Sequence, residues 1–185
     1  MPDATLVIVP GHGNSGRRHW QSLLEAERPD TLRVAQRHWR VPVRRQWIAG
    51  LARTVAGAPR RPLLIGHSLG SMTIVEWGLD RATGAGVAGA LLVAPPDLDR
   101  RLPGMPPRWM ARLCGWHGVP LRALPFPSVL VASADDPFCS LERARYFAAA
   151  WGSRFVDLGP CGHIDSDAGF GPFPQLAPLI ESLLG

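Results

Sequence analysis

The feature that most constrains this chain is the pattern Gly-x-Ser-x-Gly at residues 66–70, which follows an apolar strand pattern over 62–65 and leads into a helical pattern. In that setting the five residues are typical of a nucleophile elbow, a sharp turn from strand to helix. A side chain in place of either glycine would collide with neighbouring backbone. The turn raises the hydroxyl of Ser68 and places the backbone N–H of Leu69 at a helix N-terminus, where it can stabilise an oxyanion. The pattern predicts acyl transfer by a serine nucleophile.

The same five letters also fit an ordinary glycine-flanked turn, so the partners of Ser68 decide between the two interpretations. A serine hydroxyl needs a base within hydrogen-bond reach, and the base needs a carboxylate that orients it. In sheets of this kind the acid and then the histidine follow the serine, on loops after later strands. Asp135 and Asp136 follow the strand pattern over 128–132, and His163 follows the one over 154–157. The partners therefore occur in the expected order.

His163 is favoured as the base because it alone among the six histidines lies on a glycine-flanked loop directly after a late strand. His67, inside the elbow, is expected to point elsewhere. Asp136 is favoured as the acid because the proline after it biases its backbone toward an extended conformation, which suits a carboxylate projecting from a loop. Two adjacent carboxylates cannot both be buried and ionised cheaply, so Asp135 is predicted to be solvated or to cap a turn.

The second oxyanion donor is expected from the glycine-rich loop over 10–16, which follows the first strand pattern. The backbone N–H of Asn14 is the first candidate and that of Gly13 the second, and His12 and Gly13 are candidates for lining the pocket. The alternative, a phosphate-binding loop, lacks the lysine and the spacing of a P-loop.

Length and composition fit one globular domain over residues 1–185. The chain is 46% hydrophobic and 19% charged, and it is long enough to bury a core without disulfides or metals. Its three cysteines have the spacing of neither a zinc site nor a redox motif, and no other metal-ligand spacing appears, so we expect no metal. No apolar run approaches the ~18 residues of a membrane span, and no export segment is recognisable. The expected location is the cytoplasm, without membrane association.

The net charge of +5 raises the question of nucleic acid. All 20 basic residues are arginines, which indicates a compositional bias rather than selection for phosphate contacts. The arginines are dispersed in pairs with no recognition module around them, so no specific nucleic-acid binding is expected.

Short strand patterns alternate with longer helical patterns, which predicts a three-layer α/β/α sandwich around a mostly parallel sheet of about six strands. The expected strands are 5–9, 32–36, 62–65, 87–93, 128–132 and 154–157, and the expected helices are 15–27, 43–56, 68–81, 141–151 and 174–184. One segment, 95–127, departs from this alternation because it is rich in proline, tryptophan and arginine. It is interpreted as a lid or pocket wall, with a structural crossover as the alternative. Trp20, Trp109 and Trp116 are candidates for lining the pocket, although each also suits packing in the core or lid.

The chain resembles the small serine hydrolases of the α/β-hydrolase fold that are related to retinoblastoma-binding protein 9, in their bacterial branch. The resemblance runs almost end to end and rests on Pro10-Gly11-His12-Gly13-Asn14-Ser15 with His19-Trp20, the elbow motif, Ser133-Ala134-Asp135-Asp136-Pro137-Phe138, Ala150-Trp151-Gly152, and Gly162-His163-Ile164 followed by Gly169-Phe170-Gly171-Pro172-Phe173-Pro174. It departs at Phe173, where many relatives are expected to carry tryptophan, and this leaves the triad untouched.

The resemblance implies a reduced α/β-hydrolase core without a cofactor and a triad of Ser68, Asp136 and His163. Together these observations predict a carboxylesterase for small or short-chain acyl esters that works through an acyl-enzyme. Two alternatives stay open. One is a thioesterase or amidase with the same triad, and the other is a protein-interaction module with a weak or vestigial site, for which the sequence offers no motif.

Overall fold

The computed structural model describes residues 4–80, 86–100 and 114–185. The elements follow one another as β1 (Ala4–Val9), α1 (Trp20–Glu27), β2 (Thr31–Arg33), α2 (Arg44–Ala56), β3 (Arg61–His67), α3 (Leu69–Asp80), β4 (Gly89–Val93), β5 (Ser128–Ala132), α5 (Leu141–Trp151), β6 (Arg154–Asp157) and α6 (Leu176–Leu184). The strands form one sheet in the order β2-β1-β3-β4-β5-β6, and every pairing between neighbours is parallel. The predicted α/β architecture is confirmed, with a sheet that is wholly parallel.

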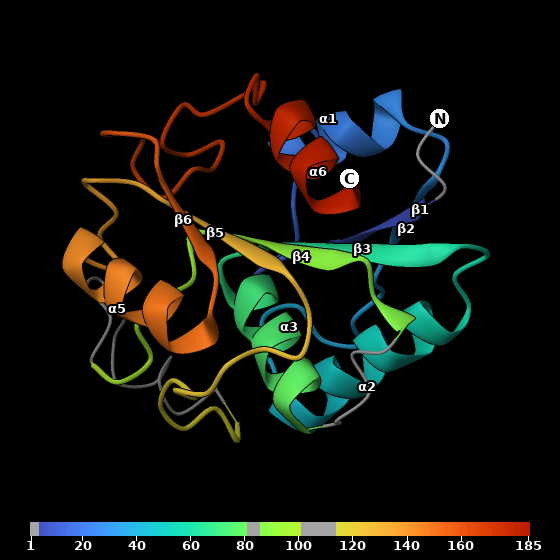
Figure 1. Ribbon diagram of the computed structural model, residues 1–185, viewed down its shortest axis with the longest axis horizontal. Helices are drawn as coiled ribbons and strands as arrows, with labels where there is room; N and C mark the ends of the chain where they lie inside the picture. The colour runs from blue at the N-terminus through green and yellow to red at the C-terminus, as the bar shows by residue number, and fades with distance from the viewer. Residues whose placement is uncertain (1–3, 81–85, 101–113) are drawn as a thin grey trace.

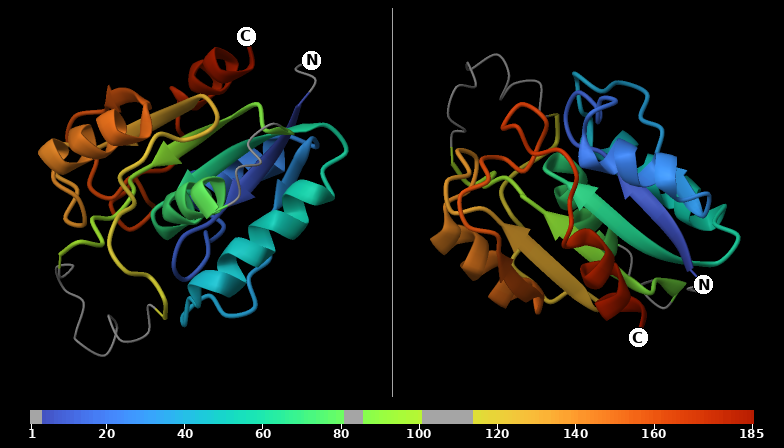
Figure 2. Two further views of the ribbon diagram at one scale, coloured as in Figure 1. Left: turned by 60° about the horizontal axis from the view of Figure 1, so that its bottom comes forward. Right: turned by 90° about the horizontal axis from the view of Figure 1, so that it is seen from above.

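Helices cover both faces of this sheet. Figure 1 shows α2, α3 and α5 below the strands and α1 and α6 above them, and Figure 2 shows the twist of the sheet from two further sides. The side chains of β1 alternate between the two layers: Val7 and Val9 join the core beneath α2, α3 and α5, whereas Leu6 and Ile8 join the core beneath α1 and α6. Because successive residues of a strand face opposite sides, one apolar strand supplies both cores.

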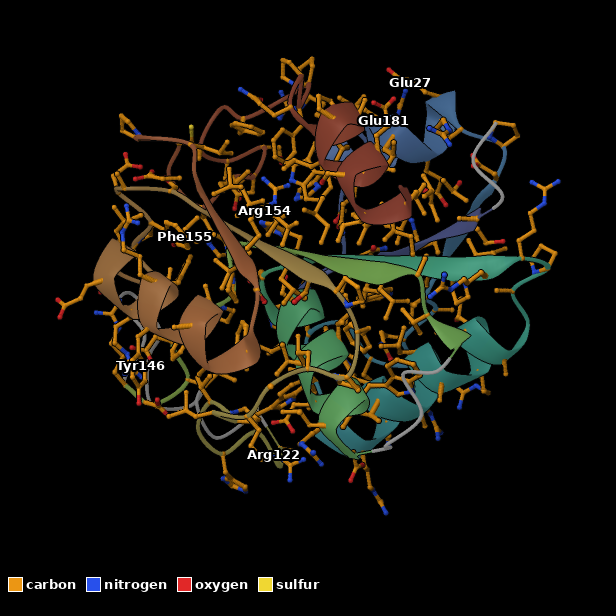
Figure 3. All side chains as sticks on the ribbon, in the orientation of Figure 1. Glu27, Arg122, Tyr146, Arg154, Phe155 and Glu181 are labelled. Carbon is orange, nitrogen blue, oxygen red and sulfur yellow. The ribbon has the colours of Figure 1, made fainter. Side chains whose placement is uncertain are left out.

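Side chains fill the space between the sheet and the helices on both faces (Figure 3). Tyr146 projects from the outer side of α5 and is half exposed. Phe155, on the edge strand β6, is covered by the guanidinium of Arg145, which lies 4.4 Å from the ring centroid. Within the described residues, no helix combines the length and the apolar character needed to cross a bilayer.

The predicted element boundaries are wrong in two places that matter for the site. Helix α1 begins at Trp20 rather than at residue 15, because His19 is its N-cap and accepts a hydrogen bond from the backbone N–H of Gln21 at 3.2 Å. Helix α3 begins at Leu69, since Ser68 has a φ of 53° and is not helical. Both helices therefore start immediately after a residue that faces the same pocket.

The proline-rich segment 95–127 is described on both sides of residues 101–113. Pro96 and Leu98 line the pocket. Farther along, Trp116 is buried and donates its indole N–H to the carbonyl of Pro42 at 3.2 Å, and Phe126 packs in the core beneath α3. The later half of the segment thus packs as a crossover between β4 and β5.

Candidate active site

The elbow has the geometry that its sequence predicts. Ser68 lies between the last residue of β3 and the first of α3, in the left-handed region of backbone conformation. A Cβ built on Gly66 would lie 2.7 Å from the Cα of Ser71, and one built on Gly70 would lie 2.0 Å from the carbonyl oxygen of Val9. Both obstacles are backbone atoms, which cannot move aside as a side chain would. Only glycine fits at either position.

His163 and Asp136 meet on the loops that follow β6 and β5. The Nδ1 atom of His163 lies 2.9 Å and 3.0 Å from the two carboxylate oxygens of Asp136, and both side chains are almost fully buried. The Oδ1 atom of Asp136 also accepts the backbone N–H of Phe138 at 2.8 Å. Because a carboxylate only accepts hydrogen bonds, a neutral His163 carries its proton on Nδ1. Its Nε2 is then left as a proton acceptor.

Asp135 has a different structural role from Asp136. Its Oδ1 accepts the hydroxyl of Ser133 and the backbone N–H of Gly162, each at 2.7 Å. These hydrogen bonds, from the Ser133 hydroxyl first, lower the pKa of the Asp135 carboxyl below its ordinary value. Asp135 therefore ties the loop after β5 to the loop that carries His163, while Asp136 contacts the imidazole.

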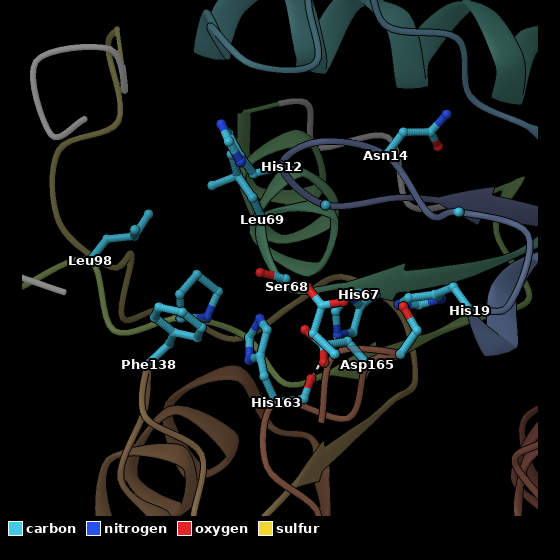
Figure 4. A pocket seen from close by; sticks show the side chains of 15 residues that line it. His12, Asn14, His19, His67, Ser68, Leu69, Leu98, Phe138, His163 and Asp165 are labelled. Atoms are coloured by element: carbon cyan, nitrogen blue, oxygen red, sulfur yellow. Dashed lines mark hydrogen bonds between the residues drawn. The ribbon is translucent and has the colours of Figure 1, made fainter. Parts of the chain in front are cut away.

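Ser68 and His163 line the same cavity of about 240 Å³. Figure 4 shows Leu98 and Phe138 on one side of Ser68, and Asn14 and His19 on the other. The cavity is lined by apolar side chains, among them Pro96, Leu98 and Phe138, and by polar ones, among them His12, Asn14, His19, Asp165, Ser166 and Asp167. Within the described residues Ser68 makes no hydrogen bond to His163. Such bonds are often long until a substrate binds.

The structure does not place the backbone N–H of Asn14 where the oxyanion prediction needs it. Residues 11–14 form a tight turn with positive φ at Gly13 and Asn14. In this turn the N–H of Asn14 donates to the carbonyl of Gly11 at 3.1 Å, and the N–H of Gly13 donates to the carbonyl of Trp39 at 3.1 Å. Asn14 still lines the pocket, whereas Gly13 is not among the residues that do.

The loop instead approaches the nucleophile at Gly11. A Cβ built on Gly11 would lie 2.9 Å from the Cβ of Ser68 and 3.5 Å from the amide nitrogen of Leu69. The next residue, His12, lines the pocket, as the sequence suggested. The amide of Leu69 is at the first position of α3, where helix N–H groups have no partner within the helix.

Of the three tryptophans proposed for the pocket, the two described ones lie elsewhere. Trp20 is 1% exposed and packs against Phe173 in the core beneath α1 and α6. Trp116 belongs to the opposite core. Both rings are large apolar surfaces with one N–H that finds a buried carbonyl, which favours the interior over a pocket wall. Trp109 lies outside the described residues.

Sequence reasoning missed a row of three histidine rings at the site (Figure 4). The ring centroids of His19 and His67 are 4.7 Å apart, and those of His67 and His163 are 5.0 Å apart. Burial lowers the pKa of His19 to about 4 and that of His67 well below its ordinary value. Both are therefore neutral at neutral pH. Nothing in the spacing of the histidines signals this contact, because it depends on how three separate segments pack.

The described parts of the chain hold no cluster of three or more His, Cys, Asp or Glu side chains placed to share a metal ion.

Comparison with known proteins gives consistent results. Residues 6–182 match the family described as serine hydrolase. A protein of Pectobacterium atrosepticum named YdeN-like hydrolase has a similar structure, with a TM-score of 0.80 and 34% sequence identity over 98% of this chain and 93% of that one. The YdeN protein of Bacillus subtilis has a TM-score of 0.76 at 18% identity, over 97% and 98% of the two chains. The esterase RhEst1 of a Rhodococcus species has a TM-score of 0.69 at 18% identity, over 98% and 91%. A search of the curated proteins finds no match.

Proposed function

The chain belongs to the serine hydrolase family, and on that premise we propose that it is a carboxylesterase for short-chain acyl esters. In this proposal Ser68 is the nucleophile, His163 the general base and Asp136 the residue that orients the base. The observation that carries the proposal is the buried contact between His163 and Asp136, which leaves Nε2 of His163 as a proton acceptor in the cavity that Ser68 also lines.

The reaction proceeds through an acyl-enzyme. The hydroxyl oxygen of Ser68 attacks the ester carbonyl carbon while its proton passes to Nε2 of His163. The bond to the leaving alkoxide then breaks, and the imidazolium returns the proton to that oxygen. A water molecule repeats the two steps against the acyl-enzyme, with His163 again as base, and releases the acid. The carboxylate of Asp136 stabilises the imidazolium in each half of the cycle.

The backbone N–H groups of Leu69 and His12 hold the oxyanion in this proposal. Leu69 follows the nucleophile at the N-terminus of α3, where the helix dipole favours negative charge. His12 replaces Asn14 as the second donor because Gly11, directly before it, is the point at which the first loop touches Ser68. The N–H of Asn14 is directed to the carbonyl of Gly11 instead.

The cavity supports the choice of a small substrate. Its volume of about 240 Å³ is below the range of about 300–1,000 Å³ that is usual for pockets of drug-sized ligands. The apolar wall of Leu98 and Phe138 suits a short acyl chain, and the polar wall on the other side of Ser68 suits an oxygen-bearing alcohol portion.

The test compares hydrolysis of p-nitrophenyl acetate, butyrate and decanoate by the wild type, Ser68→Ala and Ser182→Ala. Ser182 is a matched serine in α6, where its hydroxyl bonds to the carbonyl of Leu179 away from the pocket. We expect the wild type and Ser182→Ala to prefer the acetate or butyrate, and Ser68→Ala to lose at least about 10³-fold in kcat.

Equal rates for Ser68→Ala and the wild type would overturn the role of Ser68, and a preference for the decanoate would overturn the short-chain assignment. Thioester and amide substrates that carry the preferred acyl chain test which kind of bond the enzyme cleaves. A folded wild type that is inert toward all of these substrates would overturn the enzymatic proposal and favour a binding role.

A further inference from the structure

The loop that carries His163 has an unfavourable backbone conformation. His163 lies between two residues in the left-handed region, Gly162 with a φ of 55° and Ile164 with a φ of 52°. Glycine adopts this conformation freely, but a β-branched residue such as isoleucine rarely does. Ile164 is also completely buried, so solvent cannot satisfy its polar backbone groups. The surrounding structure must therefore hold this turn in place.

Two buried ring N–H groups hold the consecutive carbonyls of the turn. The indole Nε1–H of Trp20 donates to the carbonyl of Ile164 at 2.9 Å. The Nε2 atom of His67 lies 2.9 Å from the carbonyl oxygen of His163. Because a carbonyl only accepts, His67 carries its proton on Nε2 and is the donor. The two donors come from different places in the chain, the start of α1 and the end of β3.

These two bonds act on the peptide groups directly after His163 and directly after Ile164. Together with the bond from the N–H of Ile164 to the carbonyl of Cys161 at 3.1 Å, they fix the backbone from which the imidazole projects. Asp136 then holds the far end of the same side chain through Nδ1. The imidazole is thus anchored both at its backbone and at its ring.

We infer that Trp20 and His67 form a clamp on the carbonyls of His163 and Ile164, and that this clamp positions the imidazole of His163 for proton transfer. Neither residue is a proton donor or acceptor in the reaction itself; both are positioning residues. The inference rests on the proposed role of His163 as the base. It assigns a function to Trp20, which lies in the core, and to His67, whose position in the elbow alone does not explain why its ring points at the loop of the base.

The sharpest test compares Trp20→Phe with Trp151→Phe. Both tryptophans are 1% exposed, and both donate Nε1–H to a backbone carbonyl, in Trp151 to that of Pro120 at 2.7 Å. Each replacement keeps an aromatic ring, removes one N–H and loses the same buried ring volume, so the difference between the two variants reports on the hydrogen bond of Trp20. A displacement of the base by a fraction of an ångström affects proton transfer more than substrate binding, so we expect Trp20→Phe to lose about tenfold in kcat with KM within about twofold of the wild type. Trp151→Phe should keep the kcat of the wild type.

A second pair of variants tests His67. Glutamine retains a side-chain N–H donor near the position of Nε2, whereas leucine retains only bulk. We expect His67→Leu to lose at least about tenfold in kcat and His67→Gln to recover most of that loss. Equal losses in the two variants would show that the hydrogen bond to the carbonyl of His163 is not what matters.

Hydrogen exchange of the peptide that spans residues 158–170 separates this inference from the proposed function, because it needs no turnover. The clamp predicts faster exchange of this peptide in Trp20→Phe and unchanged exchange in Trp151→Phe. Unchanged exchange in Trp20→Phe, or a loss of kcat no greater than that of Trp151→Phe, would overturn the inference. The expected exchange difference in a protein that shows no Ser68-dependent turnover would instead overturn the proposed function and leave the clamp in place.

Discussion

Replacement of Asp136 by asparagine should reverse the hydrogen bond that holds His163, and the structure shows why. The Oδ1 atom of Asp136 accepts the backbone N–H of Phe138 at 2.8 Å. In Asp136→Asn the amide oxygen must stay at this place, since the amide NH₂ cannot accept that bond. The NH₂ group then takes the position of Oδ2, which is 2.9 Å from Nδ1 of His163.

An NH₂ group at that position donates to Nδ1 when His163 carries its proton on Nε2, and it opposes the Nδ1–H tautomer, whose one remaining acceptor on this side chain is the amide oxygen at the place of Oδ1, 3.0 Å from Nδ1. The imidazole then offers a hydrogen where it should accept the proton of Ser68. In a serine triad an imidazole in the wrong tautomer costs about 10⁴-fold in kcat, and we expect about 10³–10⁴-fold here. At 1.36 kcal/mol per tenfold this corresponds to about 4–5.5 kcal/mol of transition-state stabilisation.

The assay is the hydrolysis of p-nitrophenyl butyrate by Asp136→Asn and, as a matched control, by Asp135→Asn. The neighbouring carboxylate accepts its two protein hydrogen bonds through a single oxygen, so an asparagine there can keep both with its amide oxygen. Asp135→Asn should therefore stay within about threefold of the wild type. A loss below tenfold in Asp136→Asn, or equal losses in the two variants, would refute the assignment of Asp136 and the tautomer reasoning.

Three further outcomes are expected. Gly70→Ala should prevent folding because the new Cβ would lie 2.0 Å from the carbonyl oxygen of Val9. Gly16→Ala, whose Cβ would have no atom within 4 Å, should keep the thermal midpoint of the wild type. A stable Gly70→Ala protein would contradict the elbow geometry. Burial lowers the pKa of His19 from 6.5 to about 4. As the pH falls, His19 is therefore protonated in the unfolded chain before it is protonated in the folded protein. The stability that the neutral ring contributes is present above pH 6.5 and lost as the pH falls toward 4. The loss in the free energy of unfolding amounts to about 3 kcal/mol. Urea unfolding measured from pH 7.5 to 4.5 should show this loss in the wild type and a smaller loss in His19→Asn. Equal slopes of the free energy of unfolding against pH in the two proteins would contradict the burial of His19. Burial raises the pKa of the Cys139 thiol to about 12, so iodoacetamide should alkylate it at least about 100-fold more slowly in the folded protein than in urea, as peptide mass spectrometry can measure.

The parts of the site that follow from local sequence were predictable. The elbow is encoded within one strand, five residues and one helix; Gly66 is required by the backbone of Ser71 in the same region, whereas Gly70 is required by the carbonyl of Val9 on β1. Asp136 and His163 each lie directly after a strand, and parallel strands place such loops at one edge of the sheet. The parallel pairing follows from the same alternation of strands and helices, whereas the alternation alone does not fix the strand order β2-β1-β3-β4-β5-β6.

The parts that depend on side chains meeting distant backbone were not predictable. Asn14 was expected to direct its N–H to the oxyanion, but the turn over 11–14 closes on itself and uses that N–H. Trp20 was a candidate both for the pocket wall and for packing in the core; it lies in the core, where its N–H bonds to a carbonyl 144 positions later in the chain. The partner of His67 is a carbonyl 96 positions away. Every residue carries a backbone carbonyl, so the sequence does not indicate which carbonyl accepts the N–H of Trp20 or of His67.

The most direct test of the central claim is labelling with a fluorophosphonate, followed by peptide mapping of the adduct. An activated serine predicts one covalent adduct on Ser68 in the wild type, none in Ser68→Ala, and labelling slowed by at least about 10³-fold in His163→Ala. A folded wild type that forms no adduct, or an adduct on a residue other than Ser68, would contradict the claim that Ser68 and His163 act together as nucleophile and base.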